Sequence, residues 1–132
     1  MATTTATITL TSADLLTDDL GLSTTATLYN DPVFSTGLSR MKVVATSVHS
    51  TATTIYTADD FAAIAYIYIK NTDATATDYI YVYDDTTSGD PVILKLAGGD
   101  WAFMPTNADK TLKAYATTNP TTIEFMVIGT DQ

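Results

Sequence analysis

Two stretches of alternating aromatic and β-branched residues constrain the fold of this chain more than any other feature. Residues 64–70 read Ile-Ala-Tyr-Ile-Tyr-Ile-Lys, and residues 79–83 read Tyr-Ile-Tyr-Val-Tyr. Successive side chains of an extended chain point to opposite faces, and residues of these types fit a pleated, half-buried surface. Threonine, which favours strands and turns over helices, fills about a fifth of all positions. The sequence therefore predicts a β-rich protein.

Further segments of this kind recur about every ten residues, separated by Gly, Pro, Asn or Asp, which is typical of an antiparallel sandwich or barrel. The chain has 132 residues, of which 45% are hydrophobic, so it can bury one core. We expect an all-β fold, an antiparallel β-sandwich of the jelly-roll type. The strands expected in it are 41–48, 53–56, 64–70, 79–83, 92–96, 101–104, 111–116 and 123–128.

Residues 1–40 are expected to form an extended N-terminal arm, and residues 41–132 the β-sandwich domain. The first ten residues alternate as a strand does, Thr24–Tyr29 reads as another strand, and 11–16 reads as a short helical turn. The segment 33–40 reads as an arm or long connection. Because the N-terminal third is poor in large apolar residues, it either takes part of its order from a neighbouring subunit or remains a flexible tail.

The charge of the chain argues against several classes of partner. The formal net charge is −9 and the pI is near 4.1, with only six basic residues. A nucleic-acid-binding surface needs clustered Lys and Arg, and an anionic membrane repels an acidic protein, so we expect neither partner. No stretch has the length of a transmembrane helix, and the N-terminus lacks the features of a secretory signal, which indicates synthesis in a cytoplasm.

The chain offers little catalytic equipment. It has no cysteine and a single histidine, His49. General-base chemistry would require a serine within hydrogen-bonding reach of this histidine, together with an oxyanion pocket. In a strand Ser50 would point to the opposite face, and Ser47, on the same face, belongs to no supporting motif. We therefore expect a surface or strand-end histidine, no catalytic residue and no enzymatic activity.

The acidic residues and the paired glycines suggest metal or phosphate sites only weakly. Adjacent aspartates in a strand diverge, and nothing in the sequence brings distant pairs to the spacing that glycosidases use. The loop Asp84–Asp90 has oxygen ligands for calcium but departs from the EF-hand pattern, which favours a solvated turn over a calcium site. The segment 98–100, Gly-Gly-Asp, reads as a tight turn, because no helix or GK[ST] motif follows it. We expect no metal and no cofactor. The acidic pairs are Asp18/Asp19, Asp59/Asp60 and Asp84/Asp85.

The aromatic residues of the C-terminal half are the best candidates for a binding surface. At a period of two they suit sheet packing or a subunit interface, and they could alternatively form a platform on which sugar rings stack. Trp101, beside the double glycine, is expected to be a core anchor or an interface hot spot. The candidate interface or packing residues are Tyr66, Tyr68, Tyr79, Tyr81, Tyr83, Trp101 and Phe103.

Three segments in order along the chain carry a resemblance to a known group of proteins. They are 66–72 (Tyr-Ile-Tyr-Ile-Lys-Asn-Thr), 96–105 (Leu-Ala-Gly-Gly-Asp-Trp-Ala-Phe-Met-Pro) and 122–128 (Thr-Ile-Glu-Phe-Met-Val-Ile). This series resembles the small β-sandwich virion proteins of tailed bacteriophages, including those of marine cyanophages. The openings of such proteins are similar to 12–15 (Ser-Ala-Asp-Leu) and 37–40 (Gly-Leu-Ser-Arg).

The resemblance implies a non-enzymatic particle component that is present in many copies. The leading interpretation is a capsid decoration, or cement, protein on the exterior of the virion. Its partners would be the major capsid protein and further copies of itself, as a homo-oligomer and most plausibly a trimer. A head fibre, neck or tail component is the first alternative, because such proteins share similar sandwiches. A carbohydrate-binding module that uses the tyrosines is the alternative of another class.

Overall fold

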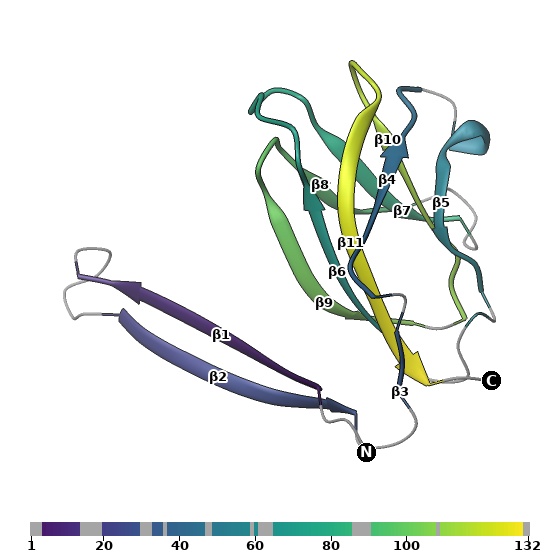
Figure 1. Cartoon of the computed structure of the whole chain (residues 1–132). Helices are drawn as coiled ribbons and strands as arrows, with labels where there is room; N and C mark the ends of the chain where they lie inside the picture. Colours follow the sequence, from purple (N-terminus) through teal and green to yellow (C-terminus); the bar gives the residue numbers. More distant parts are fainter. Residues whose placement is uncertain are drawn as a thin grey trace. The chain divides into compact units, whose positions relative to one another are not determined.

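The chain folds entirely into strands and turns over the residues that its computed structural model describes. Apart from one 3₁₀ turn at His49–Thr51, every regular element in that part of the chain is a β-strand (Figure 1). The chain divides into two compact units, Met1–Val33 and Phe34–Gln132. The described residues are 4–13, 20–29, 33–35, 37–46, 49–58, 60, 65–85, 91–107 and 109–130.

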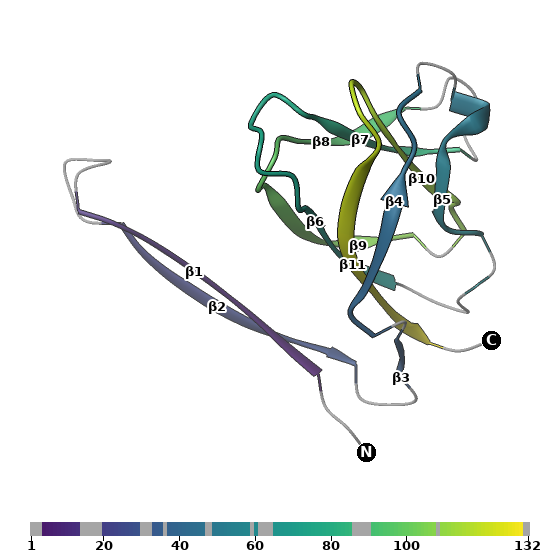
Figure 2. The same cartoon turned by 45° about the horizontal axis from the view of Figure 1, so that its top comes forward.

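Two sheets make up the larger unit, and the predicted all-β antiparallel sandwich is confirmed. The five-stranded sheet has the order β3-β11-β6-β9, and β4 also pairs with β11. The four-stranded sheet has the order β5-β10-β7-β8, and its registered pairs are antiparallel. Figure 2 shows β4 alongside β11, and β5 alongside β10. The strands are β3 (Val33–Ser35), β4 (Ser39–Val43), β5 (Thr53–Tyr56), β6 (Ala65–Asn71), β7 (Ile80–Asp84), β8 (Val92–Leu96), β9 (Trp101–Thr106), β10 (Leu112–Ala116) and β11 (Thr121–Thr130).

Alternation along the strands sends aliphatic residues into the core between the sheets. In β6, Ile67 and Ile69 are fully buried, while Tyr66 and Tyr68, which alternate with them, are only partly covered. In β7, Ile80 and Val82 are buried in the same core cluster. Burying one such side chain contributes about 1.5–3 kcal/mol, so these aliphatic faces fix which side of each sheet turns inward. The remaining fully buried core residues include Val43, Ala114, Ile123 and Val127.

A buried amide links the two sheets at the end of β6. The side chain of Asn71 has no solvent exposure. Its Nδ2 donates to the carbonyl oxygens of Asp78 at 2.8 Å and Leu96 at 3.2 Å, and its Oδ1 accepts from the amide of Asp73 at 3.1 Å. Leu96 belongs to β8 of the four-stranded sheet, so this side chain connects the two layers. We call Asn71 and these three partners the Asn71 corner.

A tight turn between β8 and β9 abuts this corner, as the glycine pair predicted. The amide of Asp100 donates to the carbonyl of Ala97 at 3.0 Å, and the Asp100 carboxylate accepts from the Ala97 amide at 3.0 Å. Gly99 has a φ of 87°, a left-handed conformation that glycine adopts without strain. A Cβ on Gly98 would collide with the carbonyl oxygen of Thr75. Both glycines are therefore required by geometry.

The smaller unit is a β-hairpin formed by β1 (Thr4–Ser12) and β2 (Leu20–Tyr29). The two strands pair antiparallel from Thr4↔Tyr29 to Ser12↔Leu20. The helical turn predicted over 11–16 is wrong at its start, because residues 11 and 12 continue β1. Backbone pairing with β2 supplies the hydrogen bonds that a cap would have used. Residues 14–16 lie outside the described part of the chain.

The segment 33–40 is also not the connection that was predicted, because it contains β3 and the start of β4. β4 begins at Ser39 and pairs with β11 over Ser39↔Phe125 to Val43↔Thr121. The strand expected over 41–48 therefore starts earlier and ends at Val43, where this pairing ends. The sandwich unit begins at Phe34, whereas the sequence placed the arm boundary after Arg40. The pairing partners lie about eighty residues away, so no local pattern marked the start of this strand at Ser39.

Candidate interaction surface

The outer face of the five-stranded sheet carries a group of aromatic side chains that the core does not use. Tyr66 and Tyr68 alternate with the buried isoleucines of β6 and are partly exposed. The register sets Tyr68 opposite Phe103 of β9, and the rings of Tyr66 and Phe103 stack with centroids 5.9 Å apart and planes 8° apart. Trp101, at the start of β9, is 59% exposed. We call Tyr66, Tyr68, Trp101, Phe103 and the neighbouring Met126 the aromatic face.

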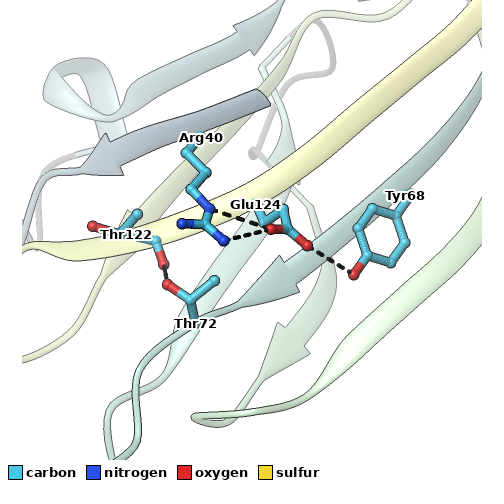
Figure 3. A network of polar contacts seen from close by, with 5 residues as sticks. All are labelled: Arg40, Tyr68, Thr72, Thr122 and Glu124. Atoms are coloured by element: carbon cyan, nitrogen blue, oxygen red, sulfur yellow. Dashed lines mark hydrogen bonds and ion pairs between the residues drawn. The ribbon is translucent and has the colours of Figure 1, made fainter. Parts of the chain in front are cut away.

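A polar network lies beside these rings on the same sheet. Glu124 of β11 lies between Lys70 of β6 and Arg40 of β4 in the register. Nε and Nη2 of Arg40 donate to Oε2 of Glu124 at 3.2 and 3.0 Å, and the hydroxyl of Tyr68 donates to Oε1 at 3.4 Å (Figure 3). The Arg40 side chain is largely exposed, so the ion pair contributes little stability. Its effect is to hold the Glu124 carboxylate beside the Tyr68 ring.

A second polar contact in Figure 3 ties the ends of β6 and β11 together. Oγ1 of Thr72 donates to the carbonyl oxygen of Thr122 at 2.6 Å. The amide of Thr72 donates to the same carbonyl at 3.1 Å. This double contact holds the end of β6 against β11 next to the Asn71 corner.

The Tyr68 hydroxyl is held in its protonated form. Burial raises its pKa above the ordinary value of 10.0, and the charge and hydrogen bond of Glu124 raise it further. The phenol is therefore a hydrogen-bond donor at neutral pH and not a base or nucleophile. The pKa values of Tyr56 and Tyr115 are raised as well, in both cases mainly by burial.

These raised pKa values predict a loss of stability in alkali. The native protein retains phenolic protons that the unfolded chain releases near pH 10, so the contribution is complete below about pH 10 and disappears as the pH rises through the native values. Chemical unfolding measured from about pH 9 to pH 12 should show a falling free energy of unfolding. The decrease should be shallower in Tyr68→Phe, which removes one titrating group. An unchanged slope in that variant would contradict the assignment.

The outer face of the four-stranded sheet carries a separate tyrosine cluster. Tyr81 of β7 stacks on Tyr115 of β10 with centroids 5.2 Å apart, and Tyr83 meets Tyr115 edge-on at 6.0 Å. Nζ of Lys95 lies 4.1 Å from the ring centroid of Tyr79 and 5.6 Å from that of Tyr81. Tyr83 is fully buried. These rings contact one another and a lysine, so they are less available to a partner than those of the aromatic face.

The structure thus separates the seven aromatic residues that the sequence selected. Tyr66, Tyr68, Trp101 and Phe103 come together on the five-stranded sheet. Tyr81 and Tyr83 belong to β7 of the four-stranded sheet and Tyr79 directly precedes that strand, so these three do not extend the same surface. Trp101 is not a core anchor, because its ring lies largely in solvent.

Four participants were missed by sequence reasoning: Met126, Tyr115, Arg40 and Glu124. Tyr115, which bridges Tyr81 and Tyr83, could have been found from its alternation with the core residues of β10. Arg40 and Glu124 are 84 positions apart, and neither carries a local pattern that would pair them. Their contact follows from the β4–β11 register alone.

The described residues contain no group of three or more His, Cys, Asp or Glu side chains that could hold a metal ion. Asp84 and Asp85 each pair with a lysine, Lys110 at 3.5 Å and Lys113 at 2.6 Å. The rest of the loop proposed for calcium, residues 86–90, lies outside the described part of the chain, as do Asp18, Asp19, Asp59 and Ser47. His49 opens the 3₁₀ turn.

A separate finding concerns membranes. Within the described residues, no helix is long and apolar enough to cross a bilayer.

Comparison with known proteins gives one distant structural likeness. No family model matches the chain, and no curated protein matches it. A solved chain from Bacillus endospore appendages, described as a novel family of disulfide-linked pili, is 16% identical with a TM-score of 0.49. The match covers 73% of this chain and 85% of that chain. A likeness at this level assigns no function.

Proposed function

We propose that this chain is a non-enzymatic structural protein that acts by binding other proteins through its aromatic face. The observation that carries the proposal is a tryptophan 59% exposed beside stacked aromatic rings on the outside of a rigid sheet. Aromatic residues are enriched at the centres of protein interfaces, and Trp and Tyr dominate interface hot spots. The ring positions are set by strand register, so little ordering entropy opposes docking.

The particular role that we propose is capsid decoration in a tailed bacteriophage virion. The support is the resemblance of segments 66–72, 96–105 and 122–128 to small phage virion proteins. In this fold the three segments meet at one end of the five-stranded sheet, where the backbone N–H of Asn71 donates to the carbonyl oxygen of Asp100 at 2.9 Å and Thr72 donates to the carbonyl oxygen of Thr122. The protein would join neighbouring copies of the major capsid protein on the outside of the capsid and associate with itself as a trimer. Its net charge of −9 suits an exposed outer layer.

Binding to undecorated capsids tests this role. Purified protein mixed with such capsids should cosediment with them at a fixed stoichiometry. Trp101→Ala combined with Phe103→Ala should weaken the binding by about thirtyfold or more, because truncation of even one hot-spot aromatic costs about 2 kcal/mol or more. The matched control is Ile93→Ala, which removes an exposed apolar side chain from the four-stranded sheet and should leave binding unchanged.

Two outcomes would contradict the proposal in different ways. Absence of capsid binding, together with density for this chain in the tail or fibres, would reject decoration and favour the alternative virion location. If the aromatic variant and Ile93→Ala lose the same affinity for capsids, the protein still binds capsids, but the aromatic face is not the binding site.

Carbohydrate binding is the second candidate, and the exposed ring of Trp101 is the observation that favours it. A flat aromatic ring in solvent can stack on the apolar face of a sugar. Binding of the purified protein on a glycan array, abolished by Trp101→Ala, would support this function. A blank array combined with capsid binding would exclude it in favour of the structural role.

A further inference from the structure

The β1–β2 hairpin is an amphipathic ribbon. Its register aligns Ile8 with Thr24 and Leu10 with Leu22 on one face. The opposite face carries hydroxyl groups at successive pairs, and Oγ1 of Thr7 lies 2.8 Å from Oγ1 of Thr25. The remaining positions on that face are Thr5, Thr9, Thr11, Gly21, Ser23 and Thr27. One face of the ribbon is therefore polar, and the other is mainly apolar.

The apolar face of the hairpin is left open to solvent. Ile8 is 37% exposed, Leu22 46% and Leu10 51%, although Leu10 and Leu22 are direct cross-strand partners. A two-stranded hairpin is marginally stable at best in water, because it has no second layer on which to bury its apolar side chains. A ribbon with this pattern gains stability by covering that face.

The distribution of charge favours a second copy of this chain as the partner that covers the apolar face. The two strands, Thr4–Ser12 and Leu20–Tyr29, contain no Asp, Glu, Lys or Arg, whereas the whole chain has a net charge of −9 and the connection between these strands contains Asp14, Asp18 and Asp19. Copies of an acidic protein repel one another, and the paired strands let two copies meet without opposing charged side chains. The apolar face is also self-complementary, since a two-fold axis would bring Leu10 and Leu22 of one copy onto the same pair of another.

We propose that the hairpins of separate copies of this chain pack apolar face to apolar face. The two ribbons would lie about 10 Å apart with Ile8, Leu10 and Leu22 between them and the hydroxyl faces in water. Nine paired positions make a ribbon about 30 Å long and about 10 Å wide, so a pair buries on the order of 600 Å². This is below the ~1,200 Å² of stable interfaces, so the contact is reversible and concentration-dependent. The inference rests on the proposed self-association and names its surface.

Sedimentation of the full chain is the first test. The wild-type mass should rise with concentration over roughly a hundredfold range, as mass action requires. Leu10→Thr combined with Leu22→Thr should remain monomeric, because threonine keeps strand propensity and removes the apolar surface. The control, Thr9→Ala combined with Ser23→Ala on the hydroxyl face, should associate as the wild type does. A monomeric wild type, or equal effects of the two double variants, would overturn the proposal.

Cross-linking locates the contact independently of hairpin stability. The chain has no cysteine, so one introduced thiol reports one position. With a short bismaleimide, Leu10→Cys should give covalently linked copies, and Thr9→Cys should not, because adjacent residues in a strand face opposite sides. Equal cross-linking at both positions would refute the face-to-face arrangement.

The same proteins separate this inference from the capsid proposal. Protein that self-associates through Leu10 but does not cosediment with capsids would retain the hairpin contact and reject decoration. Protein that stays monomeric but protects Leu10→Cys from maleimide only when capsids are added would show that a capsid protein covers the face. That result would overturn the homotypic contact and keep the decoration role.

Discussion

Replacing Asn71 with Asp is expected to lower the free energy of unfolding by about 3–5 kcal/mol, which is a large part of the total for a domain of this size. The substitution keeps the shape of the side chain and removes both Nδ2 donors. The buried carbonyl oxygens of Asp78 and Leu96 would then face a carboxyl oxygen, and each unsatisfied group costs about 1–3 kcal/mol. A buried carboxylate adds a desolvation cost.

Urea unfolding measures this effect as a lower midpoint with an unchanged slope. The control is Asn107→Asp, the same chemical change at an exposed position. The hydrogen bond from the Asp109 amide to Asn107 uses Oδ1, which aspartate retains, so stability should change by less than about 0.5 kcal/mol. Similar losses in both variants would show that the linkage between the sheets at Asn71 is unimportant.

Replacing Gly98 with Val should destabilise the sandwich by about 3 kcal/mol, as overpacking against an immovable group does. The obstacle is the backbone carbonyl oxygen of Thr75, which cannot rotate away as a flexible side chain would. The turn from β8 to β9 and the adjoining 71–78 connection would have to separate. Thermal or urea unfolding of the purified variant measures the loss.

Gly21→Val is the matched control for this substitution. No atom lies within 4 Å of a Cβ at Gly21, and its backbone conformation is open to other residues. Unfolding of the sandwich should therefore be unaffected by this change. A wild-type midpoint for Gly98→Val would mean that the 71–78 connection yields easily, and the description of the turn as sterically fixed would be wrong.

The architecture was predictable where the alternating pattern was strong. Residues 64–70 and 79–83 were expected as strands, and they form most of β6 and β7. The pattern did not predict which face of each strand turns toward the core, since Tyr and Ile both favour strands. The structure resolves this through burial, because Ile67, Ile69, Ile80 and Val82 fill the core while Tyr66, Tyr68 and Tyr81 remain partly exposed. The start of β4 at Ser39 escaped prediction because it depends on pairing with β11 and not on its own sequence.

The candidate surface was only partly predictable, for a reason of topology. The two tyrosine-rich strands are consecutive in the chain, which suggested one continuous aromatic surface. They belong to different sheets, so Tyr68 and Tyr81 lie on opposite outer faces of the sandwich. Asn71 appeared in the resembling segment without a role, since its full burial arises only when β8 closes over the end of β6.

The position of Trp101 gives the protein a built-in optical probe. It is the single tryptophan of the chain, and its ring lies mostly in water while the fold is intact. Tryptophan emission moves to shorter wavelength when water is excluded from the indole, so unfolding this protein changes the emission wavelength little. A partner that covers the aromatic face changes it strongly. Intrinsic fluorescence therefore follows docking at this surface in unlabelled protein, separately from the integrity of the core.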